Sequence, residues 1–411
     1  MVPGETFTAI DIGSSKIKTI IGTFTEDKKL RVLGVGVSAS GGVRKGNILD
    51  MDEFKKNVDA SLLEAEKMTG EETRSVYLCV SGTSIDSVVG TGIVAIPGGE
   101  VTEEDISRAL DMSQNGVDLT NREVLKVIPE SFALDNEAGI KNPAGMAAKK
   151  LEVRAHIFSV GENVLGNIKK GIADVGVDIY DVYPNVISAP EAVLTRRQKE
   201  LGVVVVDIGA STTDVAVYEE GTLIFATVIP VGGEHVTSDV AIGARVSIDL
   251  AEKLKVEYGD VAFAKEEKAK DEEIQLSKLS KTETATVSKK YLSEIVRARY
   301  SEIFYFINSE LKKIGKDGML PEGAVITGGG AKMRGVVDLA KEIFRLPAAV
   351  GIPEDSDLIS GTSIGDPVYA GVIGTLLLSQ RYGTHRHRLK LSFSMGGFLA
   401  SLKNVFSKLV P

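Results

Sequence analysis

Two short segments of the chain place a carboxylate, a glycine and small hydroxylated residues at matching spacing. They are residues 11–16 (DIGSSK) and residues 207–214 (DIGASTTD). A turn of this composition can wrap backbone N–H groups around an anion, and its hydroxyl and ammonium groups add further donors. Two such turns facing each other would hold one polyphosphate from both sides. One copy alone would more simply be an ordinary β-turn, but two copies in matching contexts favour phosphate binding.

The polar groups of both turns divide into phosphate contacts and metal ligands. The predicted phosphate contacts are Gly13, Ser14, Ser15, Lys16, Gly209, Ala210, Ser211 and Thr212. The carboxylates of Asp11 and Asp207 are expected behind the phosphates, with Asp214 close by. Because Mg²⁺ keeps several waters and usually takes only one or two protein carboxylates, these residues would hold a hydrated ion.

The elements around the turns predict an α/β protein built from two similar halves. Each turn lies between two β-branched runs, so each copy is predicted to be a hairpin. Apolar residues at helical spacing follow, at residues 52–68 in the first half and 242–258 in the second. A long helix over residues 289–314 leads to a further strand. A chain of 411 residues is long enough for two or three domains.

Three consecutive glycines follow that strand, at Gly328, Gly329 and Gly330. They remove side chains that would block a flat base or a ribose, and a helix beginning near Met333 would direct its N-terminal amides at a nucleotide. Taken alone, this is a weak signal. The chain has no Gly-x-x-x-x-Gly-Lys-[Ser/Thr] loop, and its loose dinucleotide fingerprint at residues 34–39 is followed by glycines rather than a helix.

The C-terminal end differs in charge from the rest of the chain. Six of the 48 Lys and Arg residues lie beyond Asp366 and none of the 57 acidic residues does, so this end carries +6 and the remainder −15. The asymmetry points to an anionic partner, such as a membrane surface or nucleic acid. We expect residues 381–395 to form a basic linker.

Residues 396–411 carry a continuous apolar stripe at helical spacing, opposite polar residues. The stripe consists of Phe398, Leu399, Leu402, Val405, Phe406 and Leu409. In a lipid surface each side chain would contribute about 1.5–3 kcal/mol at most, less the cost of ordering the helix, which suffices for reversible binding to anionic lipids. The alternative is a helix packed on the protein's own body, but the basic linker favours the membrane.

Composition excludes other classes of protein. A single cysteine, Cys79, rules out a disulfide within the chain, and four scattered histidines offer no metal cluster. No apolar run reaches the roughly 20 residues of a membrane-spanning helix. The N-terminus lacks a signal-peptide pattern, so a cytoplasmic location is expected.

Five segments taken together resemble the nucleotide-binding motifs of the actin, sugar kinase and heat-shock chaperone superfamily. These are the two phosphate turns, the glycine segment, and two connecting segments at residues 187–192 and 366–374. The resemblance implies an actin-like (ribonuclease H-like) two-domain α/β fold around a cleft for ATP and Mg²⁺.

The same resemblance implies roles for residues outside the turns. Gly232, Gly233, Glu252 and Lys255 would border the nucleotide, alongside the glycine segment and Met333. Glu191 matches the position that orients an attacking water, and an exposed helix acid is an equally good interpretation. The implied activity is a weak ATPase at most.

Within the superfamily, the chain resembles the FtsA family of bacterial cell-division proteins. The resemblance rests on residues 46–50 (GNILD), 80–84 (VSGTS), 127–130 (VIPE) and 139–146 (GIKNPAGM). The family usually has a histidine where Lys126 stands, a departure that does not touch the nucleotide site. The alternatives are a small-molecule kinase of the same superfamily and a pilus-assembly actin homologue.

Family resemblance also implies domain boundaries. They are a first core subdomain (1–83, 162–195 and 366–380), an inserted α+β subdomain (84–161), a second core subdomain (196–229 and 305–365), a small nucleotide-covering subdomain (230–304), the linker (381–395) and an amphipathic membrane helix (396–411).

The implied partners are the C-terminal peptide of FtsZ, further copies of the chain in a filament, anionic lipids and other division proteins, with no nucleic acid. The implied place is the cytoplasmic face of the inner membrane at the division site. Lys289, Lys290, Arg297 and Arg299 are candidates to meet acidic groups of the FtsZ peptide, and a solvated helix face is at least as good an interpretation.

Overall fold

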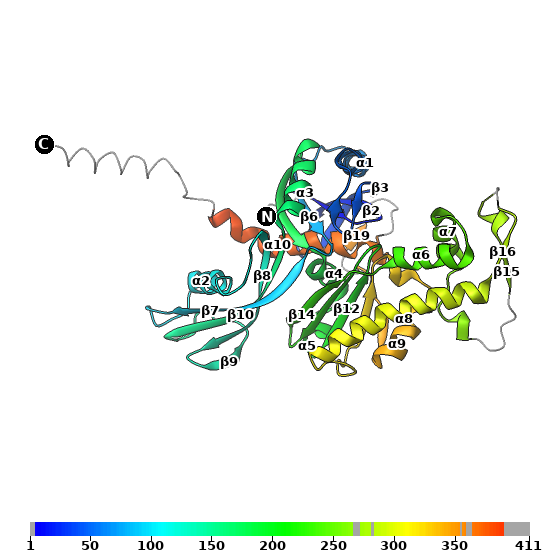
Figure 1. The fold of residues 1–411 in the computed structure, drawn as a ribbon. Coiled ribbons are helices and arrows are strands. Elements are labelled where there is room, and N and C mark those ends of the chain that lie inside the picture. Colours follow the sequence, from blue (N-terminus) through cyan, green and yellow to red (C-terminus); the bar gives the residue numbers. More distant parts are fainter. Residues whose placement is uncertain (1–4, 266–271, 281–282, 354–355, 359–363, 390–411) are drawn as a thin grey trace.

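The computed structural model describes residues 5–265, 272–280, 283–353, 356–358 and 364–389. Two α/β halves lie side by side, and a smaller sheet with one helix projects from the first half (Figure 1). The α/β class and the inserted α+β subdomain expected from the sequence are both confirmed.

A six-stranded sheet forms the first half, in the order β11-β6-β1-β2-β3-β19. Its strands are β1 (Thr6–Ile12), β2 (Lys16–Phe24), β3 (Leu30–Ala39), β6 (Ser75–Val80), β11 (Asp178–Pro184) and β19 (Ser356–Leu358), and a short pair, β4 (Val43–Arg44) and β5 (Asn47–Ile48), lies beside it. Strands β1 and β2 pair antiparallel, as the predicted hairpin requires. Helices α1 (Met51–Thr69) and α3 (Glu162–Asp174) cover one face.

Helices α4 (Asn185–Val193) and α10 (Ala370–Leu389) belong to the opposite face of this sheet. Alternation along β1 explains both layers, because Ile10 packs with Phe54 of α1, while Ala9 packs with Val372 of α10. Asp11 has the same parity as Ala9, so its carboxylate faces the side of α4 and α10 rather than that of α1.

The second half is a five-stranded sheet in the order β14-β13-β12-β17-β18. Its strands are β12 (Val203–Ile208), β13 (Thr213–Glu219), β14 (Thr222–Ile229), β17 (Ala324–Thr327) and β18 (Ala348–Val350). It is joined to the first half by α5 (Arg196–Leu201) and carries α6 (Gly233–Ala244), α7 (Ile248–Tyr258), α8 (Lys289–Lys313), α9 (Val336–Phe344) and the pair β15 (Glu273–Gln275) and β16 (Thr286–Ser288). Strands β12 and β13 form the second predicted hairpin.

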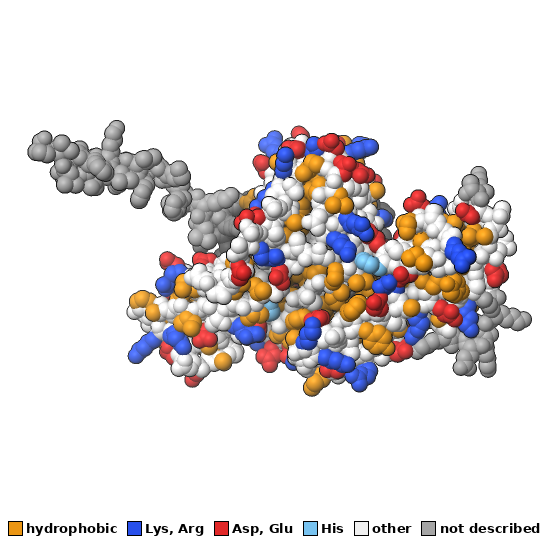
Figure 2. Space-filling view, in the orientation of Figure 1, with side chains coloured by type: hydrophobic (Ala, Val, Ile, Leu, Met, Phe, Trp, Pro, Cys, Tyr) orange, Lys and Arg blue, Asp and Glu red, His pale blue; other side chains and the backbone are white. Residues whose placement is uncertain are grey.

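The inserted sheet has the order β7-β10-β8-β9, with strands β7 (Asp86–Ala95), β8 (Arg122–Leu134), β9 (Glu137–Ile140) and β10 (Lys150–Gly161). Helix α2 (Glu103–Ser113) packs on it and is N-capped by Thr102, whose side chain accepts from Asp105 N in a capping box. Leu151, Val153 and Ala155 form a separate small core with α2 and β8. In the space-filling view, apolar side chains gather mainly where the parts meet, and charged ones are scattered over the rest of the visible face (Figure 2).

Two predicted helices and the predicted linker differ from the structure. Residues 242–258 form parts of two helices instead of one, because Arg245 adopts a left-handed backbone (φ 56°) that ends α6, and Ser247 caps α7. The helix expected near Met333 begins at Val336, after a 3₁₀ turn over Gly329–Lys332. Helix α10 continues through Leu389, so the predicted linker begins as helix. The stripe at residues 396–411 lies outside the described residues.

Candidate functional site

Both hairpins place their carboxylates in buried positions where the halves meet. Asp11 lies near the end of β1, and Asp207 near the end of β12; their side chains belong to residues that are 6% and 8% exposed. Asp207 and Asp214 are direct cross-strand partners in the antiparallel register of β12 and β13. The structure therefore brings the three predicted carboxylates into one buried centre, which we call the carboxylate centre.

Asn185, which the sequence analysis did not single out, crosses between the halves at this centre. Its Nδ2 donates to Asp207 Oδ2 at 2.9 Å and to Asp214 Oδ2 at 2.7 Å. The Cys79 thiol donates to Asn185 Oδ1 at 3.5 Å, a contact that holds the amide in this orientation. Asn185 is the first residue of α4, directly after strand β11. A polar residue at that strand end was the signal available in the sequence.

Lys18, rather than the predicted Lys16, supplies the buried cation. Lys18 Nζ lies 2.6 Å from Asp11 Oδ2 and donates to the Val368 carbonyl at 2.8 Å. Burial alone would lower the pKa of Lys18, but the carboxylates of Asp11 and Asp207 outweigh it and raise the pKa. Lys16 is exposed. The hairpin register explains the difference, because Lys18 is the cross-strand partner of Asp11.

Two carboxyl groups of the carboxylate centre, those of Asp207 and Asp214, have raised pKa values. Burial, reinforced by the charge of Asp207, raises the pKa of Asp214 to about 8, although the hydrogen bond from Asn185 opposes the shift. Burial also raises the pKa of Asp207. Like charges this close in a dry site cannot all ionise, so Asp214 remains largely protonated at neutral pH without a bound cation.

At three glycines the backbone lies closer to its neighbours than any side chain would allow. A Cβ on Gly13 would lie 2.8 Å from the Lys16 carbonyl oxygen, and one on Gly232 would lie 2.6 Å from that of Gly209. At Gly328, whose φ is +78°, it would lie 2.0 Å from Asp207 Oδ1. Nothing lies within 4 Å of the corresponding position at Gly329, so that side of the segment is open.

The N-terminus of α6 is folded onto the second turn. Gly233 N donates to the Gly209 carbonyl at 2.9 Å, and Glu234 N donates to that of Ala210 at 2.8 Å. The Ser211 hydroxyl donates to Glu234 at 2.9 Å. Ser211 and Thr212 are both buried, whereas Ser14 is half-buried and Ser15 is exposed. The hydroxyl contacts expected from the second turn are therefore weaker candidates than those of the first.

Glu252 and Lys255 lie beside this helix start, and their expected place along the nucleotide stays a prediction. Lys255 Nζ contacts Glu252 at 2.6 Å, Thr237 Oγ1 at 2.8 Å and the Gly233 carbonyl at 3.2 Å. The network joins α6 to α7. The glycine segment lies nearby, since Tyr300 donates to the Gly330 carbonyl at 3.0 Å, and burial together with the charge of Glu252 raises the pKa of Tyr300. Met333 follows the 3₁₀ turn of this segment.

The chemistry of the residues fits a hydrated Mg²⁺ but not a bare one. Across the described ranges, no three His, Cys, Asp or Glu side chains are arranged to hold a metal ion directly. Asn185 donates to one oxygen of Asp207 and to one of Asp214, and Lys18 contacts Asp11, so all three carboxylates share an oxygen with a protein donor. Because a hydrated Mg²⁺ usually takes only one or two carboxylates, Asp11 and Asp207 stay the predicted pair, with Asp214 close by.

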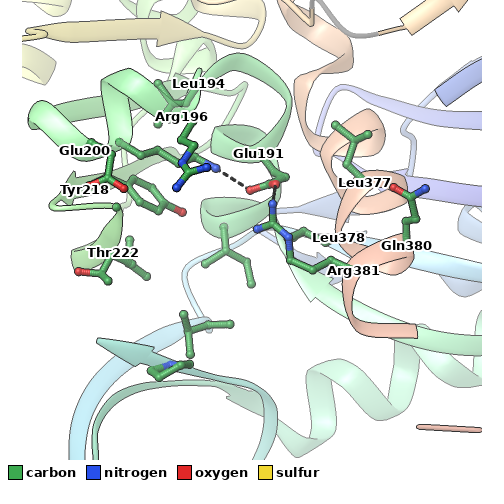
Figure 3. Close-up of a pocket in the computed structure, with 16 residues that line it drawn as sticks. Glu191, Leu194, Arg196, Glu200, Tyr218, Thr222, Leu377, Leu378, Gln380 and Arg381 are labelled. Atoms are coloured by element: carbon green, nitrogen blue, oxygen red, sulfur yellow. Dashed lines mark hydrogen bonds and ion pairs between the residues drawn. The ribbon is translucent and has the colours of Figure 1, made fainter. Parts of the chain in front are cut away.

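Glu191 is not part of this centre. It lies six residues beyond Asn185 on α4, about 9 Å along the helix. Its Oε2 is 2.6 Å from Lys199 Nζ, and its Oε1 is 2.6 Å from Arg381. A cavity of ≈ 680 Å³ opens there, lined by α4, α5, α10 and the inserted β8 (Figure 3). Both carboxylate oxygens of Glu191 are held by cations in this arrangement, which does not favour a role in orienting an attacking water, and that role stays a prediction.

The cations proposed to meet a partner peptide are engaged within the protein. Lys289 lies 3.2 Å from Glu272 and 4.5 Å from the centre of the Phe263 ring. Arg297 donates to the Val261 carbonyl and to Glu342, both at 2.9 Å, and Arg299 donates to Asp239 at 2.6 and 3.0 Å. These contacts favour the alternative, a helix face whose charges are already paired. In the described part of the chain, no helix is long and apolar enough to cross a membrane.

Comparison with known proteins extends this picture. The family model described as cell division protein FtsA matches residues 204–374, and that of the SHS2 domain inserted in FtsA matches residues 82–159. Cell division protein FtsA of Pseudomonas aeruginosa is 33% identical over 394 residues, covering 96% of this chain and 93% of the relative. FtsA of Bacillus subtilis is 31% identical, covering 95% and 87%. FtsA of Escherichia coli is 30% identical, covering 92% and 90%.

Solved structures show the same fold at much lower identity. A PilM–PilN type IV pilus biogenesis complex contains a chain with a TM-score of 0.65 at 14% identity, covering 90% of this chain and 98% of the other. MreB5 of Spiroplasma citri bound to ADP gives a TM-score of 0.54 at 15% identity, covering 95% and 99%. These likenesses confirm the actin-like fold, and the sequence relatives identify the branch. The chain belongs to the FtsA family of actin-like cell-division proteins.

Proposed function

We propose that the chain binds ATP with Mg²⁺ in the cleft between its two halves. The observation that carries this proposal is the convergence of both hairpins on Asp11, Lys18 and Asp207, beside backbone that only glycine can form. Asp11 and Asp207 would hold the hydrated ion, and Lys18 and the positive end of α6 would complement the phosphates. When bound, Mg²⁺ would neutralise phosphate charge and orient the triphosphate.

The nucleotide works in this proposal as a structural ligand. Glu191, the base that the sequence suggested, is occupied by Lys199 and Arg381. We therefore infer weak ATP hydrolysis at most. Binding without hydrolysis still changes the conformational equilibrium, because a ligand that contacts both halves stabilises the arrangement in which the halves are close.

At the level of the cell, the protein polymerises and tethers the FtsZ ring to the cytoplasmic face of the inner membrane at the division site. Membership of the FtsA family supports the partner. The basic end of the chain and the apolar stripe from Phe398 to Leu409 support reversible attachment to anionic lipids. Other division proteins would join the same assembly.

Recruitment of FtsZ to liposomes tests this function directly. Purified FtsZ is mixed with anionic liposomes and the intact protein, a variant lacking residues 396–411, or Asp207→Ala, and the amount of FtsZ that floats with lipid is measured with MgATP. Intact protein should recruit FtsZ, the tail-deleted variant should not, and Asp207→Ala should bind lipid but recruit less FtsZ.

A tail variant of unchanged length provides the matched control. Leu402→Ser and Phe406→Ser interrupt the stripe but leave all six basic residues in place, so they separate apolar insertion from charge attraction. Equal recruitment of FtsZ by the intact and tail-deleted proteins would refute the tether.

A further inference from the structure

Glu191 lies where three elements meet, on the far side of α4 from any nucleotide chemistry. One carboxylate oxygen contacts Lys199 of α5, and the other contacts Arg381 of α10, each at 2.6 Å. The side chains of Glu191 and Lys199 are only 13% and 14% exposed, whereas that of Arg381 is 59% exposed. Figure 3 shows Arg381 pointing from α10 toward Glu191 at the edge of the cavity. We call Glu191, Lys199 and Arg381 the ion-pair cluster.

Helices α4 and α10 are packed too closely to slide past each other. A Cβ on Gly371 would lie 2.2 Å from Asn185 Oδ1, and one on Gly374 would lie 1.8 Å from the Ser188 carbonyl oxygen. Thr375 Oγ1 also donates to Ser188 Oγ at 3.1 Å. Together with the Glu191–Arg381 ion pair, these contacts follow the same order along both helices, since later residues of α4 contact later residues of α10. The two helices therefore form one parallel, interlocked unit.

This unit is attached to the second half at both of its ends. At the first end, Asn185 donates to Asp207 and Asp214. At the other end, Glu191 contacts Lys199, and α5 is fixed to the turn between β13 and β14, where the Gly221 amide donates to the Lys199 carbonyl at 2.9 Å. A displacement of Asn185 therefore has to be accommodated at the ion-pair cluster, since the helices between them cannot deform independently.

We propose that the ion-pair cluster couples the nucleotide state of the cleft to the C-terminal turns of α10. The inference rests on the nucleotide binding proposed above, and it names the C-terminal turns of α10 as the part of the protein that responds to the nucleotide. A nucleotide and its cation bound against Asp207 would compete for the carboxylate oxygen that Asn185 contacts, which shifts Asn185 and with it the unit formed by α4 and α10. The Glu191–Lys199 pair is then remade or lost, and Arg381 moves with Glu191, at the point where the basic end of the chain begins.

Hydrogen–deuterium exchange of the α10 amides from Leu376 to Leu389 tests the coupling in the full-length protein. Exchange is followed by mass spectrometry with and without MgATP, for the wild type, Glu191→Gln and a matched control, Glu219→Gln. Glu219 pairs with Lys316 at 2.6 Å entirely within the second half, so the control removes an equivalent charge without touching α10.

MgATP should change the exchange rate of these amides by about fivefold or more in the wild type and the control, the lower end of typical couplings between sites. In Glu191→Gln, the change should disappear although MgATP still binds. Arg381→Gln, which alters a mostly exposed side chain, should also abolish the change and serves if Glu191→Gln does not fold.

Two negative results are distinguishable. If the wild type fails to bind MgATP, the proposed function is wrong, and the coupling is refuted with it. If the wild type and both cluster variants bind MgATP and respond equally at α10, or if α10 does not respond in any of them, nucleotide binding stands and the coupling alone is refuted.

Discussion

Asn185 of the first half is hydrogen-bonded to Asp207 of the second, with 2.9 Å between Nδ2 and Oδ2. The same Nδ2 donates to Asp214, so one amide group bridges two buried carboxyl groups from neighbouring strands, whereas Asp214 Oδ1 is buried without a hydrogen-bond partner. The bond joins the two halves where both hairpins end. Its geometry makes Asn185 a positioning residue for the carboxylate centre.

Asn185→Leu keeps the approximate size of this side chain and removes its donors. Two buried carboxyl groups would then lack a partner, which should lower the free energy of unfolding by about 1–3 kcal/mol. Urea denaturation of the nucleotide-free protein measures the change. Asn115→Leu, at an exposed position, is the control and should change the stability by less than about 0.5 kcal/mol. Equal stability of both variants would contradict the role of Asn185.

Gly328 and Gly329 offer a matched pair of substitutions. In Gly328→Ala, the new Cβ would lie 2.0 Å from Asp207 Oδ1, at a φ of +78°, so the backbone or Asp207 has to move. We expect a loss of about 1–3 kcal/mol of stability and a loss of nucleotide binding. Gly329→Ala meets nothing within 4 Å and should fold like the wild type. Denaturation curves and titration with a fluorescent ATP analogue distinguish the two, and an unaffected Gly328→Ala would refute the close approach.

Local sequence patterns predicted most of the scaffold. Both hairpins follow from β-branched runs around a glycine turn, and α1 follows from its apolar spacing; in the structure Asp50 and Gly70 cap this helix. The break between α6 and α7 was missed because Arg245, a residue with no special preference for positive φ, adopts φ 56° there. Packing of the helices on either side imposes that conformation, and no local pattern records it.

Long-range pairing explains what the sequence did not reveal about the site. Lys18 could have been found, because a tight hairpin fixes the register that places it opposite Asp11. The engagement of Glu191 depends on Arg381, which is 190 positions away along the chain, and no spacing rule connects them. The motif match placed Glu191 on a helix that lies between the halves, which is α4 in the structure. Only the packing of α10 against α4 shows that the Glu191 carboxylate contacts Arg381.

Lys18→Met and Lys16→Met test which lysine belongs to the site. Removing the Lys18 ammonium leaves Asp11 buried without its charge partner, which typically costs about 3–5 kcal/mol of stability. Lys16 is exposed, so its replacement should cost less than about 0.5 kcal/mol. Thermal unfolding without nucleotide measures both. If Lys16→Met is the more destabilising change, the register of the first hairpin is wrong.

The raised pKa of Asp214 predicts a pH dependence of stability with a definite sign. Its carboxyl group has a pKa of about 8 in the folded protein, whereas an ordinary aspartate has a pKa of 3.8, so the folded state binds more protons than the unfolded chain between these values. The resulting stabilisation is fully present below the unfolded pKa and is lost as the pH rises toward and through 8. Metal binding would displace the proton, so the effect belongs to metal-free protein.

The stability of the wild type should therefore fall relative to that of Asp214→Asn as the pH rises from 5 to 8.5, by a few kcal/mol at roughly 1.4 kcal/mol per pKa unit. Urea denaturation in EDTA at several pH values gives this difference. Subtracting the free energy of unfolding of Asp214→Asn from that of the wild type cancels the contribution of titratable groups that both proteins share. His156 is one of these: burial lowers its pKa, so its contribution to stability is lost as the pH falls and runs opposite to that of Asp214. A difference between the two proteins that stays constant with pH would show that Asp214 is ionised in the folded protein throughout this range.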